Sequence, residues 1–236
     1  MKNKQQNRIS KSLTRFISCF LIIGLFSTVS IAQQCPPDQP GCTDWETFTA
    51  TVSIPDYPEC TLTVNYRVRV CQGIFQIADI SFFTDVFACG ALISDAFGVF
   101  FGGDQLAQER FNARLIAQVE TEISNQLFEQ ARAGIPDALL LCGSGLETVT
   151  TNFYRGSCVS FCVSRDDDGS IGFNSISCGR TCCVKSIVYC IDPVSSQTVT
   201  TETSEPLNSA ECFSLPIPSC PGNSLFQSPC FALCEN

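Results

Sequence analysis

The chain has 236 residues, of which 44% are hydrophobic, 16% are charged and 17 are cysteines, while histidine is absent. With 14 basic and 23 acidic residues its net charge is −9, which disfavours a nucleic-acid partner because a negative field repels phosphates. The lack of histidine excludes Ser-His-Asp and Cys-His nucleophile systems, together with histidine-containing metal sites.

The first 32 residues have the pattern of an export signal. Basic residues precede an uncharged apolar run over 16–32, in which Ser30 and Ala32 supply the small residues of a signal-peptidase site. We expect the mature chain to begin at Gln33 and, having lost five basic residues, to carry a net charge of −14. A retained membrane anchor is the alternative, although this run is at the short limit for crossing a bilayer.

Two alternating segments predict a β-hairpin early in the mature chain. Apolar residues occupy every second position of 46–54 and of 61–70, and the turn-forming segment 55–59 separates them. Cys60 and Cys71 bracket the second strand. At about 3.3 Å per residue they lie too far apart to bond each other, so each is expected to bridge to another element.

Segment 73–103 is the most apolar part of the mature chain and holds seven phenylalanines. We expect a third strand near 75–82, followed by an irregular or short helical piece through Ile93. These phenylalanines either pack as core beneath the following helix or form an exposed apolar patch for a partner or hydrophobic ligand.

The segment from Asp104 to Gly134 predicts one long amphipathic helix. Asp104 is suited to cap its amino end, and Gly134, followed by Pro136, is suited to end it with a left-handed cap. The predicted apolar stripe recurs at steps of mostly four and consists of Leu106, Phe111, Leu115, Val119, Ile123, Leu127 and Ala131, widened by Ile116 and Phe128.

The remainder of the chain again has β patterns. A hairpin is expected around the turn 166–170, and a second one should pair 184–191 with 197–203 across Asp192-Pro193. From 206 onward little periodicity remains, which predicts a loop-rich tail held by bridges rather than by a core.

Sixteen cysteines remain after the signal, an even number that predicts a disulfide framework in an oxidising compartment. Five precede the long helix and eleven follow it, so complete oxidation within one chain requires at least one bridge across the helix. A cysteine-only zinc site is the alternative. The cysteines are Cys35, Cys42, Cys60, Cys71, Cys89, Cys142, Cys158, Cys162, Cys178, Cys182, Cys183, Cys190, Cys212, Cys220, Cys230 and Cys234.

Asp166 and Asp168, followed by Gly169, match part of a calcium loop, in which alternate oxygens converge and glycine permits the bend. Ser164 and Ser175 stand where acidic ligands belong, so a polar hairpin turn is the competing interpretation. Calcium at Asp166 and Asp168 is therefore one hypothesis for this segment, and no other cofactor is indicated.

A second polar feature is the pair Arg67 and Arg69, which share one face of the predicted second strand. Exposed arginines in this arrangement either keep a solvated face soluble or receive an anionic ligand such as a carboxylate or sulfate.

Together these patterns predict an α+β, disulfide-rich protein in which antiparallel β-hairpins pack on one long amphipathic helix. After the signal peptide 1–32, one domain over 33–236 is expected, with a hairpin-and-helix part at 45–141 and a cysteine-rich β part and tail at 142–236.

The favoured function is that of a non-catalytic extracellular or cell-surface protein, either a structural component or a binding module for an extracellular protein or ligand. No nucleic-acid partner and no stable membrane span after signal cleavage are expected. One alternative is a secreted hydrolase that uses a carboxylate pair. Another is an apolar-ligand carrier that uses the phenylalanine-rich segment.

Overall fold

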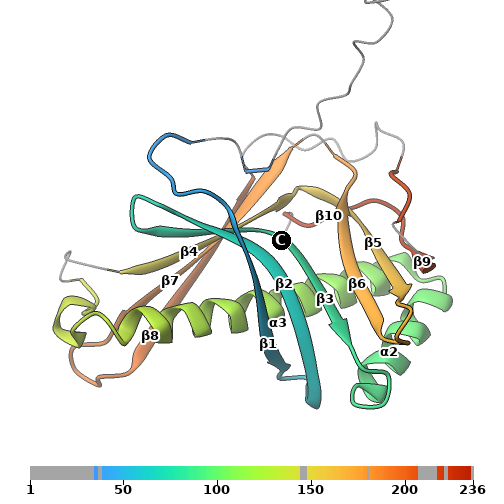
Figure 1. Cartoon of the computed structure of the whole chain (residues 1–236), viewed down its shortest axis with the longest axis horizontal. Helices are drawn as coiled ribbons and strands as arrows, with labels where there is room; N and C mark the ends of the chain where they lie inside the picture. The colour runs from blue at the N-terminus through green and yellow to red at the C-terminus, as the bar shows by residue number, and fades with distance from the viewer. Residues whose placement is uncertain are drawn as a thin grey trace, which may run out of the picture. The chain divides into compact units, whose positions relative to one another are not determined.

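The computed structural model describes residues 35–36, 39–143, 148–179, 181–206, 217–220 and 223–234. The predicted signal peptide and Cys212 therefore lie outside the described residues. Within these residues the chain forms a mixed β-sheet with two α-helices and many disulfides, an architecture consistent with the predicted α+β, disulfide-rich class (Figure 1).

The sheet begins with an antiparallel meander of β1 (Glu46–Ile54), β2 (Tyr57–Cys71) and β3 (Ile74–Thr84). The predicted first hairpin and third strand are thus present. Gln72 and Gly73, with φ values of 52° and 83°, make the two-residue turn between β2 and β3, a backbone conformation that matches the twist of paired strands.

β3 is the strand at which the sheet divides. One edge pairs with β2, whereas the other edge pairs in parallel with β4 (Val149–Gly156) over Phe75–Ile77 and antiparallel with β6 (Ile171–Ser177) over Ser81–Thr84. Between the two pairings β3 carries one residue more than β2, and Asp79 has a φ of 55°. This bulge bends β3, so its two halves meet different neighbours.

Two groups of strands continue the sheet from the two halves of β3. In one, β4 continues to β7 (Cys182–Ile191) and β8 (Thr198–Pro206). In the other, β6 continues to β5 (Cys158–Arg165), whose far edge pairs with β9 (Ser224–Gln227) and β10 (Phe231–Ala232). The two hairpins predicted after the long helix are both present, as β5–β6 and β7–β8.

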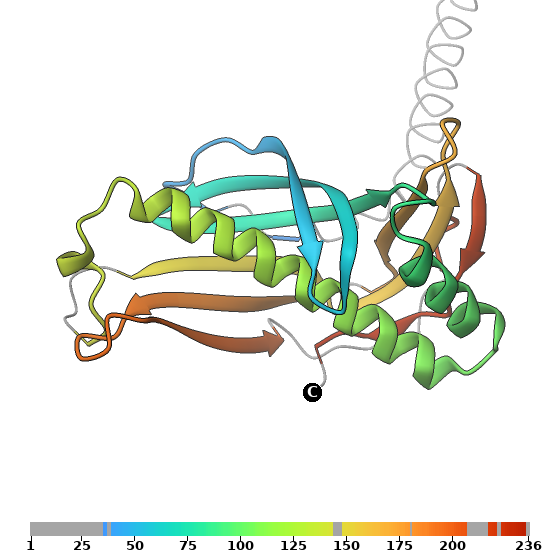
Figure 2. The same ribbon diagram turned by 90° about the horizontal axis from the view of Figure 1, so that it is seen from below.

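Both α-helices lie on one face of the sheet (Figure 2). α3 (Gln105–Arg132) begins as expected, because the Asp104 side chain accepts the Ala107 N–H at 3.2 Å. It ends on Ala133 in a right-handed conformation, so the expected left-handed cap at Gly134 is wrong. A short 3₁₀ turn, η1 (Asp137–Leu139), follows. No helix among the described residues is long and apolar enough to cross a membrane.

α2 (Gly90–Phe101) stands where an irregular or short helical piece was expected. It is a full 12-residue helix because Leu92, Ile93, Ala96 and Phe100 recur at helical spacing and pack into the core. The prediction of a single helix is therefore incomplete. β2, with Leu62 and Val64 buried, lies against the same core.

Seven disulfides join described cysteines, and Cys158 is also disulfide-bonded. Cys35–Cys182 provides the expected bridge across the long helix. Cys182 and its neighbour Cys183 bond to opposite ends of the chain, since successive strand residues point to opposite faces. The pairs are Cys35–Cys182, Cys42–Cys71, Cys60–Cys89, Cys142–Cys190, Cys162–Cys220, Cys178–Cys230 and Cys183–Cys234. This network indicates an extracellular, disulfide-stabilised protein from an oxidising environment.

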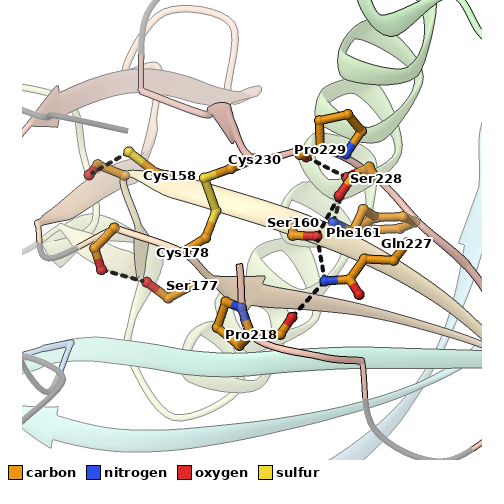
Figure 3. Close-up of a disulfide and its surroundings, with 12 residues drawn as sticks. Cys158, Ser160, Phe161, Ser177, Cys178, Pro218, Gln227, Ser228, Pro229 and Cys230 are labelled. Atoms are coloured by element: carbon orange, nitrogen blue, oxygen red, sulfur yellow. Dashed lines mark hydrogen bonds between the residues drawn. A yellow bond between two sulfur atoms is a disulfide. The ribbon is translucent and has the colours of Figure 1, made fainter. Parts of the chain in front are cut away.

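The described part of the C-terminal tail is bound along β5 (Figure 3). Ser160 Oγ donates to the Ser228 carbonyl at 2.7 Å, and Ser228 Oγ accepts the Phe161 N–H at 2.8 Å. Beside these contacts Cys178 bonds to Cys230. Bridges and side-chain hydrogen bonds thus hold the tail, which adds the short strands β9 and β10 to the sheet.

Candidate functional site

A cleft of about 770 Å³ opens at one end of the sheet. It is lined by Thr61 and Thr63 of β2, by residues 83–88 after the middle of β3, and by Arg165, Asp166 and residues 168–170 of the turn between β5 and β6. These two connections lie at the same end of the sheet in both ribbon views (Figures 1 and 2). We call this feature the sheet-end cleft.

The floor of the sheet-end cleft includes Thr63 and Phe83, which belong to a row of paired residues across three strands. Thr63 pairs with Phe83, and Phe83 pairs with Gly172. Leu62 and Phe82, the strand neighbours of Thr63 and Phe83, are buried in the core. Because side chains alternate along a strand, Thr63 and Phe83 project from the face opposite the helices.

Gly172 lets the Phe83 ring lie across this row. A Cβ added at residue 172 would stand 2.9 Å from Ser164 Oγ and 3.1 Å from Phe83 Cε1, so these neighbours would have to shift. Glycine at residue 172 therefore lets the Phe83 ring lie close to the backbone of the neighbouring strand.

One wall of the cleft is the connection between β3 and α2. Asp85 Oδ1 accepts the backbone N–H groups of Phe87 at 2.6 Å and Ala88 at 3.3 Å, which fixes the turn. Cys89, at the end of the turn, bonds to Cys60 on β2. Phe87 is 97% exposed on this anchored turn.

The other wall is the turn between β5 and β6. Asp166 N donates to the Ser170 carbonyl at 2.9 Å, and Gly169, with a φ of 89°, supplies the left-handed residue of the turn. Behind the turn, Arg165 N donates to the Asn223 carbonyl at 3.1 Å, and Cys162 bonds to Cys220. Both walls are thus held by hydrogen bonds and a disulfide.

Asp168 on this wall is ionised and internally bonded. The hydroxyl and the backbone N–H of Ser170 lower the pKa of Asp168 below its usual value, and the N–H to Oδ1 distance is 2.9 Å. One of its carboxylate oxygens is therefore committed to the turn, while the side chain remains exposed at the cleft.

The structure places both predicted calcium ligands, Asp166 and Asp168, in this turn. Within the described residues no three histidine, cysteine, aspartate or glutamate side chains gather in a way that would hold a metal ion. Because Ca²⁺ also accepts carbonyl and water oxygens as ligands, this finding does not test the calcium hypothesis, which stays a prediction.

Arg67 and Arg69 are not the solvated pair that their strand position suggested. Arg69 is only 5% exposed, donates from Nε to Gln76 Oε1 at 2.9 Å, and lies 4.5 Å from the centre of the Trp45 ring. Arg67 lies over the same ring at 5.3 Å and pairs with Asp79. Trp45 covers this face of β2, so its arginines are packing residues rather than a free anion site.

The sequence reasoning did not name Asp85, Thr61 or Thr63 as candidate site residues, and it included Phe87 only among the phenylalanines of segment 73–103. It left open whether the phenylalanine-rich segment was core or patch, and the structure assigns different residues to each. Phe82 and Phe100 are 2% exposed, whereas Phe87 and Phe101 are 97% and 68% exposed. The sequence does contain one signal for this turn: Asp85 stands two residues before Phe87, a spacing typical of an Asx turn.

Comparisons of this chain with protein-family models, with curated proteins and with solved structures find no match.

Proposed function

We propose that this protein is a non-catalytic extracellular binding module and that the sheet-end cleft is its ligand site. The observation that carries the proposal is the cleft itself: an opening of about 770 Å³ with an almost fully exposed aromatic side chain, on a disulfide-anchored framework. Pockets of this size that combine apolar and polar groups are typical ligand sites.

The anchoring of both walls supports binding. Asp85 fixes the turn that carries Phe87, the Cys60–Cys89 bridge ends that turn, and the Cys162–Cys220 bridge ties β5 to the tail three residues before the other wall begins. A site that is already held in its bound shape loses less conformational entropy when a ligand enters.

A secreted hydrolase is the second candidate, favoured by Asp85, Asp166 and Asp168 in one cleft. Hydrolysis of a glycosidic bond requires one carboxyl to remain protonated as general acid, which needs a raised pKa. The pKa of Asp168 is shifted in the opposite direction, so this residue suits an acceptor rather than an acid. An apolar-ligand carrier gains no support from a cleft with three carboxylates.

The test is a ligand screen by NMR on the isotope-labelled, oxidised protein. Saccharides, cationic and anionic peptides, fatty acids, nucleotides and Ca²⁺ are added separately, and amide shifts are mapped on the structure. We expect one ligand class to shift amides of Thr61, residues 85–88 and 165–170. If every class leaves these amides unchanged at millimolar concentration, or if all shifts map elsewhere, the cleft is not a ligand site.

Two exposed phenylalanines provide a matched pair of variants for the same screen. Phe87→Ala removes the aromatic group of the cleft, and Phe101→Ala removes an exposed phenylalanine of α2 that does not line it. Loss of binding in the first variant alone supports the cleft. Release of product from a bound substrate by the native protein would instead support the hydrolase.

A further inference from the structure

We infer that the ligand of the sheet-end cleft is a neutral saccharide, an inference that rests on the proposed binding function. A sugar presents hydroxyl groups along its edge and C–H groups on its ring faces. Its recognition therefore requires flat apolar side chains next to hydrogen-bond donors and acceptors, within one opening.

The apolar part of this requirement is met by Phe83 and Phe87. Phe83 lies on the floor over Gly172, and Phe87 projects from the wall, 97% exposed. Asp85 and Cys89 anchor the turn that carries Phe87, so the ring is held at the opening of the cleft. A sugar C–H face would cover it.

The polar part comes from hydroxyls and charges of both signs. Thr61 and Thr63 present hydroxyls from β2, while Asp166 and Asp168 accept hydrogen bonds and Arg165 donates them. The hydroxyl groups of a sugar both donate and accept hydrogen bonds, so they match this mixture of donors and acceptors.

The charges at the cleft also argue against an anionic ligand. Three carboxylates, of Asp85, Asp166 and Asp168, oppose an anionic ligand, and the whole chain carries a net charge of −9. Among the described residues of the lining, the one cationic group is the guanidinium of Arg165, beside Gly169 on the same rim, so the cleft remains acidic. An uncharged polyol meets no repulsion there, and its hydroxyl groups use the carboxylates as acceptors and the guanidinium as a donor.

The experiment uses the full oxidised protein on an array of neutral, anionic and cationic oligosaccharides, followed by titration calorimetry with the best neutral tetrasaccharide. Binding should shift the amides of Phe87 and Gly169 in NMR spectra and should not depend strongly on salt, because no net charge is neutralised. We expect Phe87→Ala to weaken binding about tenfold, as loss of one aromatic contact does, and Phe101→Ala to change it less than twofold.

A second pair of variants tests the polar rim. Asp166→Asn keeps the size and one acceptor and should weaken a neutral sugar severalfold, whereas Asp167→Asn, in the same turn but outside the lining, should not. Preference for anionic or cationic sugars overturns the inference of neutrality.

Failure of the saccharide inference and failure of the binding function are distinguishable. If no saccharide binds but another ligand class shifts cleft amides, the saccharide inference fails while the binding module stands. If no ligand of any class shifts them, both fail. If a sugar binds with equal affinity in the native protein and Phe87→Ala, its site is not this cleft and the inference is overturned.

Discussion

The carboxylate of Glu120 on α3 accepts a hydrogen bond from Nη1 of Arg155 on β4 at 3.1 Å, although the Glu120 residue is only 1% exposed. Nζ of Lys185 on β7 lies 3.6 Å from Glu120 Oε2 and 3.1 Å from Glu202 Oε2 on β8. Lys185 is 6% exposed and is the last lysine in the chain. These four charged side chains thus connect the long helix to strands β4, β7 and β8.

We predict that Glu120→Gln destabilises the protein by about 3–5 kcal/mol, because the buried charges of Arg155 and Lys185 would lose their partner. Asp137→Asn, which breaks the exposed Arg132–Asp137 pair, should cause a much smaller loss. Guanidinium unfolding of the oxidised proteins, followed by Trp45 fluorescence, measures both. Equal effects of the two variants would show that burial adds nothing to the Glu120 interaction.

The same network shows where sequence reasoning on α3 was incomplete. The apolar stripe through Leu115, Val119, Ile123 and Leu127 is buried as expected. Leu106, at its start, is 52% exposed because the first turn of α3 extends beyond the core. Beside the stripe runs a second buried row at steps of four, with largely polar members: Gln108, Asn112, Ile116, Glu120, Ser124 and Phe128.

The spacing of apolar residues cannot predict that the polar members of this row are buried, because a buried glutamate and a solvated glutamate look the same in the sequence. What distinguishes Glu120 is its cationic partners, Arg155 and Lys185, which lie 35 and 65 residues further along the chain. Only the tertiary structure brings them together.

The pairing of β3 with two different strands along one edge could not be predicted from the sequence, for a related reason. Local alternation and turn residues predicted each hairpin, since both depend on near neighbours. The parallel pairing of β3 with β4 joins residues 76 positions apart, and the bulge in β3 contains a left-handed aspartate, Asp79. No local pattern of apolar residues specifies either feature. The sheet-end cleft, built by β2, β3 and β5–β6 together, follows from that division.

Acid should weaken the contact between the first hairpin and α3. Hydrogen bonds from Arg114 and Gln118 of α3 lower the pKa of Asp56 below its usual 3.8. A group whose pKa is lowered on folding stabilises the protein above its unfolded pKa, and this contribution is lost as pH falls through the folded value. We expect stability to fall below about pH 4 and to fall less steeply in Asp56→Asn.

Urea midpoints of the native protein and Asp56→Asn at pH 6 and pH 2.5 test this expectation. Asp44→Asn removes the same charge from the segment before β1 and serves as the control. Part of the acid dependence should remain in Asp56→Asn, since the pKa values of Asp137 and Asp192 are also lowered by hydrogen bonds. An unchanged difference between the two pH values in Asp56→Asn would contradict the prediction.

Alkali should act on Tyr57, at the start of β2. Burial and the hydrogen bond that its hydroxyl donates to Asp95 Oδ2, at 2.9 Å, raise the pKa of Tyr57 to about 12. A raised folded pKa means that the stabilisation is complete below the unfolded value near 10 and is lost as pH rises through 12. Phenolate absorbance near 295 nm should therefore lose a late-titrating component in Tyr57→Phe. A component of unchanged size would assign the late titration to another tyrosine.

Loss of the Cys60–Cys89 disulfide can separate two effects, the stability of the whole protein and the shape of the cleft wall that carries Phe87. Cys60–Cys89 and Cys42–Cys71 both join residues 29 positions apart, so loss of either should destabilise the protein by a similar amount, about 3–4 kcal/mol on loop-closure grounds. Only Cys60–Cys89 ends the turn that forms a wall of the cleft. We expect Cys60→Ala/Cys89→Ala to increase hydrogen exchange at amides 85–88 and to weaken cleft ligands, whereas Cys42→Ala/Cys71→Ala loses stability alone. If both double variants affect exchange and binding equally, the wall is held by global stability rather than by its own bridge.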